Sequence, residues 1–192
     1  MSRLIANNRG SRTCVHHVSL AGLLLASLVW AGCSVQTGTP PERAAAAKAL
    51  FDHATKDFHN PSADANGAEQ VRLQKEATLC YQRLLKDYPD QPAWCAQALC
   101  SWAGLRAAQT NLDGAVRLYA RVERDYPQQT WEVLRALKSA ADLLWASGRR
   151  NDARSFYQRI VTRFDRPDAP AIFSTVVHGS KLRIKEAESS HP

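Results

Sequence analysis

Cys33 is the residue whose type and position most clearly favour a chemical modification of this chain. It follows Val18–Trp30, an uncharged stretch of 13 mostly apolar residues, and the two small residues Ala31 and Gly32. Residues 1–20 hold three arginines and no acidic residue. A permanent spanning helix needs roughly 20 apolar residues, so the pattern predicts a signal peptide over residues 1–32 that is removed before Cys33. The alternative is an uncleaved membrane anchor.

The five residues that end at Cys33 resemble a bacterial lipobox. Val29-Trp30-Ala31-Gly32-Cys33 has the small residues and the cysteine of that motif, although Trp30 stands where Leu is commonest. The resemblance implies that the Cys33 thiol is linked to diacylglycerol, so that acyl chains such as palmitate hold the mature protein at a membrane. Each buried methylene of such a chain contributes about 0.8 kcal/mol. Ser34 stands where lipoproteins kept at the inner membrane typically carry Asp, which implies an outer-membrane lipoprotein that faces the periplasm.

Residues 33–41 are expected to form the lipidated cysteine and a short linker. The segment after Cys33, Ser34–Pro41, is rich in Gly, Thr and Pro and has no apolar periodicity. Eight extended residues span at most about 26 Å. We therefore expect the rest of the protein to stay close to the membrane surface.

Cys80, Cys95 and Cys100 are the remaining candidates for thiol chemistry. In the oxidising compartment that an exported chain meets, one pair of them can form a disulfide and leave one thiol over. Cys80 and Cys100 lie about ten residues before and after the Pro89–Pro92 turn, which would place them level across an antiparallel hairpin. We expect either a Cys80–Cys100 disulfide or three small side chains buried between helices.

Catalytic and metal-binding motifs do not occur in the sequence. It contains no HExxH, GxSxG, GxxxxGK or GxGxxG pattern. The six histidines have no spacing typical of metal ligands, and His178 is expected to be a partly buried structural residue beside Gly179. We therefore expect no enzymatic activity, no catalytic residue, no metal, no cofactor and no small-molecule substrate.

The net charge of +7 gives little support to nucleic-acid binding. Three of the positive charges belong to the arginines of residues 1–32. The remaining excess is mild and is usual for the solvated surface of a helical domain. Nucleic acid is therefore not an expected partner.

An internal repeat of 38 residues organises the rest of the chain. Ala, Tyr and aliphatic residues recur at this interval and predict helices that pack through one stripe, because positions 0, 4 and 7 lie on one helical face. The repeated packing residues are Ala77, Tyr81 and Leu84, then Ala115, Tyr119 and Val122, and finally Ala153, Tyr157 and Ile160. Pro89 and Pro127 share the interval and are expected to end two of the helices.

This spacing resembles the second helix of the tetratricopeptide repeat. That family has Ala, an aromatic residue four positions on, an aliphatic residue three further and Pro after five more, which the first two copies match. In the third copy Asp165 replaces the proline. The resemblance implies an all-α fold, an α-solenoid of about three helical hairpins with a C-terminal capping helix, and a role in binding proteins. The Tyr88-Pro89-Asp90 turn is similar to turns in outer-membrane lipoproteins of the barrel-assembly type and in periplasmic proteins of the Tol-Pal system.

Seven helices are expected in a repeat domain over residues 42–187, followed by a tail at 188–192. Residues 59–67 contain Pro61 and Gly67 and are expected to form one longer loop. The predicted helices cover residues 42–58, 68–88, 92–108, 112–126, 129–147, 149–165 and 169–187. The small residues Ala103, Ala141 and Gly179 share the repeat interval and are expected to allow close helix packing.

The concave surface of such a solenoid is the expected binding site. In tetratricopeptide domains the first helix of each repeat lines it, and by position this implies Gln97, Cys100, Arg135, Lys138 and Asp142. The expected function is a membrane-anchored interaction scaffold for envelope proteins or peptides. Alternatives are a pilotin-like chaperone for an outer-membrane subunit and an accessory factor to a peptidoglycan enzyme.

A row of arginines also follows the repeat. Arg83, Arg121 and Arg159 lie 38 residues apart, each beside a buried aliphatic position. They are expected to form a solvated outer face with their apolar stems packed down. The alternative is that they meet an acidic partner or lipid phosphates.

Overall fold

The computed structural model describes residues 38–189, all of which belong to the unit Gln36–Pro192. The predicted signal peptide, Cys33 and most of the linker lie outside the described residues. Within 38–189 every regular element is a helix and no strand occurs, so the predicted all-α class is confirmed. The elements are α1 (Pro40–His53), the π-helix η1 (Ala54–His59), α2 (Asn60–Asp64), α3 (Gly67–Asp87), α4 (Pro92–Ala108), α5 (Leu112–Asp125), α6 (Thr130–Ala146), α7 (Arg150–Phe164) and α8 (Ala171–Ser189).

The predicted loop at residues 59–67 is wrong. The segments α1, η1 and α2 follow one another without a break, so only Ala65 and Asn66 separate this long helix from α3. Pro61 is the second residue of α2 and lies directly after the π-helical segment η1, where the hydrogen-bond spacing changes from i→i+5 to i→i+4. With these segments joined, the described residues hold seven helical stretches, which is the predicted number.

The ends of the helices follow from proline and from left-handed residues. α3 and α5 end directly before Tyr88-Pro89 and Tyr126-Pro127, because proline has no N–H to continue the helix. After α4 and α6 the chain turns through a positive φ, of 57° at Thr110 and 81° at Gly148. These two positions are 38 residues apart, so one turn geometry is built once with Thr and once with Gly.

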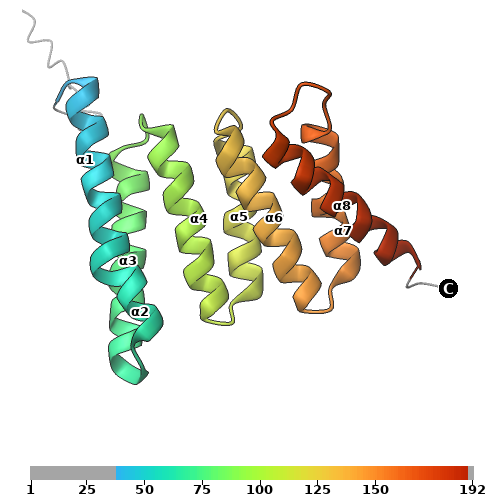
Figure 1. Cartoon of the computed structure of the whole chain (residues 1–192). Coiled ribbons are helices and arrows are strands. Elements are labelled where there is room, and N and C mark those ends of the chain that lie inside the picture. Colours follow the sequence, from blue (N-terminus) through green and yellow to red (C-terminus); the bar gives the residue numbers. More distant parts are fainter. Residues whose placement is uncertain (1–37, 190–192) are drawn as a thin grey trace, which may run out of the picture. The chain divides into compact units, whose positions relative to one another are not determined.

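Successive helices lie side by side in the order of the sequence. α3 packs on α4, α4 on α5, α5 on α6, α6 on α7 and α7 on α8, with a further contact between α4 and α6. Figure 1 shows these helices running in alternating directions through the unit. Short turns between antiparallel neighbours therefore organise the packing.

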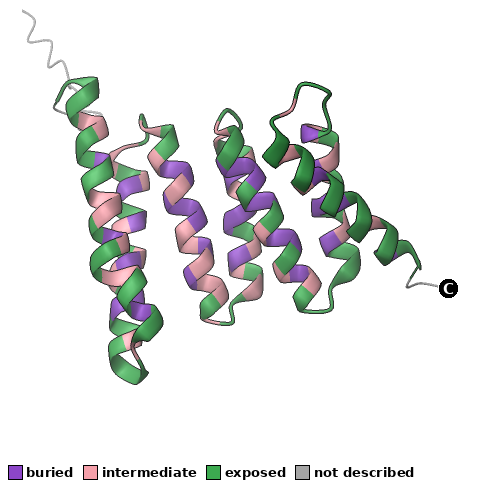
Figure 2. Cartoon of the chain, viewed as in Figure 1, coloured by how far each residue is buried: buried purple, intermediate pink, exposed green. Residues whose placement is uncertain are grey.

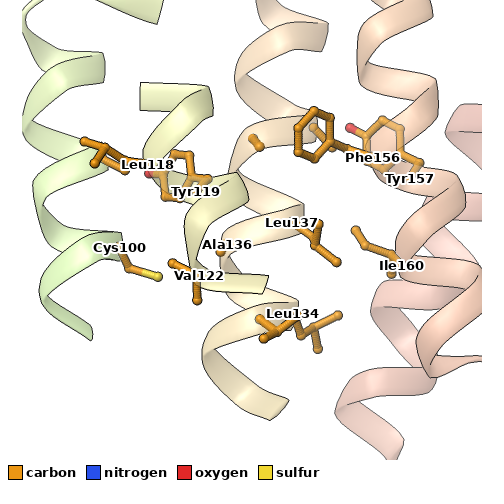
Figure 3. Packing of buried hydrophobic residues seen from close by; sticks show 14 of the residues in the cluster. Cys100, Leu118, Tyr119, Val122, Leu134, Ala136, Leu137, Phe156, Tyr157 and Ile160 are labelled. Atoms are coloured by element: carbon orange, nitrogen blue, oxygen red, sulfur yellow. The ribbon is translucent and has the colours of Figure 1, made fainter. Parts of the chain in front are cut away.

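The nine repeated packing residues are all buried, at 8% exposure or less. Figure 2 shows the buried residues on the faces where neighbouring helices meet. The core has two clusters. One contains Ala77, Tyr81 and Leu84, and the other contains the six repeated residues of α5 and α7. Figure 3 shows part of the second cluster, in which Leu134 and Leu137 of α6 lie between the side chains of α5 and α7.

The repeat interval fails at α8. Ala103 and Ala141 are fully buried as expected, but Gly179 is exposed, and a side chain added there would meet open space. The buried face of α8 instead carries Val177, Ser180 and Ala187. His178 is exposed, so the expectation of a partly buried histidine is also wrong. The cause is the connection from α7, which is six residues long where the corresponding earlier connections have four, so α8 starts in a different register.

Candidate interaction groove between α6 and α8

Two adjoining hollows lie between α6 and α8. The larger has a volume of about 460 Å³ and the smaller about 150 Å³. Both are lined by Lys138, Asp142 and Val176, so they form one surface, which we term the α6–α8 groove. Its full lining is Trp131, Leu134, Arg135, Lys138, Ser139, Asp142, Trp145 and Ala146 of α6, Tyr157 of α7, and Thr175, Val176, Gly179, Ser180 and Arg183 of α8.

The helical period explains why these α6 residues share a face. Trp131, Arg135, Lys138, Asp142 and Trp145 are separated by steps of four and three residues, which place side chains along one stripe of a helix. The opposite stripe of α6 carries the buried aliphatic residues of the core. The same helix therefore fills the core with one face and lines the groove with the other.

A hydrogen-bonded network lies in the floor of the groove. Asp142 forms an ion pair with Lys138 and accepts a hydrogen bond of 2.8 Å from the hydroxyl of Tyr157. Burial, and then the neighbouring Asp142 carboxylate, raise the pKa of Tyr157. The phenol therefore stays protonated at neutral pH and keeps donating. This network holds the Asp142 carboxylate in a fixed position.

Arg135 and Cys100 form a second polar cluster beside the groove. The guanidinium of Arg135 lies 2.5 Å from the carboxylate of Glu132. The Cys100 thiol lies 3.8 Å from the backbone oxygen of Glu132, and burial raises the pKa of this thiol to about 12. Since the thiolate is the reactive form, Cys100 is inert at neutral pH.

Aromatic rings form the walls of the groove. Trp131 stacks on Phe173 of α8 with ring centroids 6.1 Å apart, and Trp131 remains 52% exposed. The Arg183 guanidinium lies 4.7 Å from the centroid of Trp145, which in turn meets the Tyr157 ring edge-on at 6.1 Å. Half-exposed aromatic rings held in place by their neighbours offer apolar contact area at a low entropic cost.

Three of the five predicted groove residues meet in one place. Arg135, Lys138 and Asp142 line the α6–α8 groove, whereas Gln97 lies half-buried on α4 and lines neither hollow. Cys100 is buried, so it does not offer a groove surface. Trp131 and Trp145 were not predicted as groove residues, although they share the four-and-three spacing on α6 with Arg135, Lys138 and Asp142.

The contribution of α8 could not be found in the same way. Val176 and Arg183 line the groove because of the shifted register of α8, which the repeat interval does not encode. Tyr157 was expected only as a core residue, yet its hydroxyl reaches Asp142 at the groove.

The Cys80–Cys100 disulfide is wrong for this structure, in which Cys80, Cys95 and Cys100 are all free thiols. Cys100 packs in the cluster with α6 and points at the Glu132 backbone, while Cys80 packs against the other cluster. Cys95 directs its thiol to the Tyr88 backbone oxygen at 3.2 Å. The hairpin places α3 and α4 side by side, but the rotation of each helix turns the two thiols to different faces.

Residues 38–189 contain neither a metal-binding cluster nor a membrane-spanning helix. They contain no group of three or more His, Cys, Asp and Glu side chains that could hold a metal ion. None of the helices in this range is both long and apolar enough to cross a membrane.

Neither a family model nor a curated protein sequence matches this chain.

Proposed function

We propose that this protein is a tetratricopeptide-like scaffold that binds another protein through the α6–α8 groove. In this proposal α1 pairs with α3, α4 with α5 and α6 with α7, and α8 is the terminal cap. The burial of all nine repeated residues supports it, as do the Tyr-Pro turns after α3 and α5. Stacked hairpins of this kind leave extended surfaces that suit protein segments.

The open, aromatic lining of the α6–α8 groove is the observation that carries this proposal. Trp131 is half-exposed although it stacks on Phe173, so the ring has a fixed position and a free surface on which an apolar side chain of a partner can pack. Lys138, Asp142 and Tyr157 add fixed polar groups in the floor. Aromatic anchors beside a few fixed polar groups are typical of sites that recognise a peptide or a protein surface.

The charge of the lining favours a partner with acidic groups next to its apolar residues. Three cations, Arg135, Lys138 and Arg183, line the groove together with one carboxylate, Asp142. Arg135 and Arg183 also pair with Glu132 and Glu186, two carboxylates that do not line the groove. Charged rims of this kind set the orientation and the association rate of a partner more than the final affinity.

We further propose that the scaffold is tethered to the outer membrane through lipidated Cys33 and works in the cell envelope. The apolar run and the small residues before Cys33 support this proposal. Replacement of Cys33 by Ala should abolish globomycin-sensitive processing and release the protein from the membrane fraction. Unchanged processing and fractionation of the C33A variant would contradict the tether.

Charge reversal in the groove tests the binding proposal. The double variant Arg135→Glu, Lys138→Glu should lose a partner that the native chain retains in a pull-down from detergent-solubilised envelope. The matched control is Arg83→Glu, Lys86→Glu on α3, which reverses two exposed cations outside the groove and likewise breaks an i,i+4 ion pair, Arg83 with Asp87. Retention of every partner by the groove variant, or equal loss in both variants, would refute the groove assignment.

The aromatic wall gives an independent test with the captured partner. Trp131→Ala should raise the Kd for that partner at least about tenfold, because buried tryptophans at interfaces typically contribute 2 kcal/mol or more. Since Trp131 is half-exposed in the free protein, the variant should keep its helical circular dichroism. An unchanged Kd would show that Trp131 does not contact the partner.

A further inference from the structure

A separate hollow of about 350 Å³ lies between α4 and α5, and it shares no residue with the α6–α8 groove. Its lining contains three arginines and no carboxylate. The lining residues are Trp102 and Arg106 of α4, Asn111 at the turn, and Gly114, Arg117, Leu118 and Arg121 of α5. We term it the arginine hollow.

The helical period brings these cations together. Arg117 and Arg121 are four residues apart on α5 and therefore lie on one face. Trp102 and Arg106 have the same spacing on α4. Each helix thus presents one pair of side chains to the hollow. The closely packed α4–α5 hairpin fixes the two pairs relative to each other.

Two of the three arginines have no acidic partner. Arg117 makes no hydrogen bond or ion pair with the part of the chain that the structure describes. Arg106 donates only to the neutral amide oxygen of Gln109, at 3.2 Å, and lies 5.9 Å from the centroid of Trp102. Arg121 shares Asp125 with Arg124, at 3.3 Å from the carboxylate.

The arginines at the equivalent repeat positions, and Arg149, are paired with acids. Arg83 pairs with Asp87 and Arg159 with Glu123, although both are 38 residues from Arg121 in the repeat. Arg149 is held by both Asp113 and Asp152. The repeat therefore supplies an arginine in each hairpin, and in the α4–α5 hairpin two arginines without an acidic partner, Arg106 and Arg117, line the same hollow as Arg121.

We propose that the arginine hollow binds a phosphate group. A phosphate carries up to two negative charges and several strong acceptor oxygens, which match guanidinium groups arriving from two helices. The hollow is larger than a single phosphate, and the ring of Trp102 offers an apolar face to whatever the phosphate is attached to. The phosphate has two possible sources, a soluble phosphate compound or the headgroup of an anionic lipid.

Calorimetry and vesicle binding with the full chain test this proposal and separate the two sources. Inorganic phosphate is titrated against the full chain in mild detergent, with chloride at equal ionic strength as the reference. In a second arm the chain is mixed with phosphatidylcholine vesicles with and without phosphatidylglycerol, and the difference between the two vesicles is measured. Binding in the first arm identifies a soluble phosphate, and a preference for phosphatidylglycerol alone identifies a headgroup.

Two substitutions and one control decide the outcome. Arg117→Gln and Arg106→Gln should each weaken binding about tenfold in the arm that shows it, because each removes charged hydrogen bonds to the phosphate. Arg166→Gln is the matched control, since it removes one exposed arginine that lies outside the hollow and has no side-chain partner among the described residues, and it should leave binding unchanged. Equal weakening by R117Q and R166Q would overturn the proposal, and so would the absence of binding in both arms.

Discussion

Tyr81 and Tyr157 occupy the same position of the repeat, yet the structure gives them different chemistry. Tyr81 is fully buried in the first region, α1 to α3, where its hydroxyl lies 2.9 Å from His59 Nδ1 and 3.2 Å from Thr55 Oγ1. Tyr157 is buried in the last region, α6 to α8, but its hydroxyl donates to Asp142 at the groove. The repeat fixes where each ring packs, and the neighbouring helix decides what the hydroxyl does.

The residues around the two tyrosine hydroxyls differ because, in the first region, the continuous helix formed by α1, η1 and α2 covers Tyr81. The π-helical segment Ala54–His59 brings Thr55 and His59 over the ring of Tyr81, and burial lowers the pKa of His59 so that it is neutral at pH 7. In the last region α8 starts in a shifted register and leaves Lys138 and Asp142 open to solvent. The Tyr81 hydroxyl thus lies within the core, whereas the Tyr157 hydroxyl lies at the groove that we propose as a binding surface.

Removal of the Tyr81 ring should have the largest effect. Tyr81→Ala leaves a cavity in a fully buried site and should lower the free energy of unfolding by about 3–5 kcal/mol. Urea denaturation followed by circular dichroism measures this loss. The exposed residue Val71 on α3 provides the control, because Val71→Ala should change stability by less than about 0.5 kcal/mol. A loss below about 1 kcal/mol for Y81A would show that the first region has no tightly packed core at this ring.

Removal of only the hydroxyl group, from Tyr81 or from Tyr157, should affect stability in the first region and partner binding in the last. Tyr81→Phe should cost about 1 kcal/mol of stability, since it leaves the half-buried His59 and Thr55 without this partner, and should not alter partner binding. Tyr157→Phe should cost less because Asp142 is open to water and keeps Lys138, but it should weaken binding to the groove. Denaturation and Kd measurements on both variants give the comparison. Equal effects on binding would contradict the division between core and groove.

Substitutions in the turns after α4 and α6 should have the smallest effect on stability, and the two changes should have opposite signs. Thr110 has a φ of 57°, where a residue with a β-carbon is strained, so Thr110→Gly should stabilise the fold by about 1 kcal/mol. Gly148 has a φ of 81° with open space around it, so Gly148→Ala should destabilise by a similar amount through backbone strain alone. Each change corresponds to a shift of about 2–4 °C in Tm. Shifts of the same sign in both variants would show that the two turns are not equivalent.

Local periodicity predicted the helices well because the spacing of apolar residues depends only on residues that are close in the sequence. The steps of three, four and seven residues identified the buried faces of α3, α5 and α7, and Pro89 and Pro127 marked two helix ends. The helix through Pro61 was missed because a proline directly after a π-helical segment and a proline in a loop look alike in sequence. A π-helical segment also has no signal in the apolar pattern.

Contacts between helices distant in the sequence could not be predicted in the same way. Cys80 and Cys100 were placed level along the hairpin, but their faces depend on how each helix rotates against its other neighbours. The groove residues of α6 were identified by position, while Val176 and Arg183 depend on the length of the α7–α8 connection. The arginine hollow likewise depends on which cations lack an acid nearby, and only the folded chain determines that.

Leu85, Trp102 and Tyr126 pack against both core clusters. Arrays of helical repeats are commonly able to fray one unit at a time, because each unit contacts only its neighbours. Here the unfolding of either cluster would expose these three side chains, which also pack against the other cluster. Native-state hydrogen exchange should therefore report a single cooperative opening of α3 to α7, with the slowest amides in α4 and α5, where these shared side chains meet.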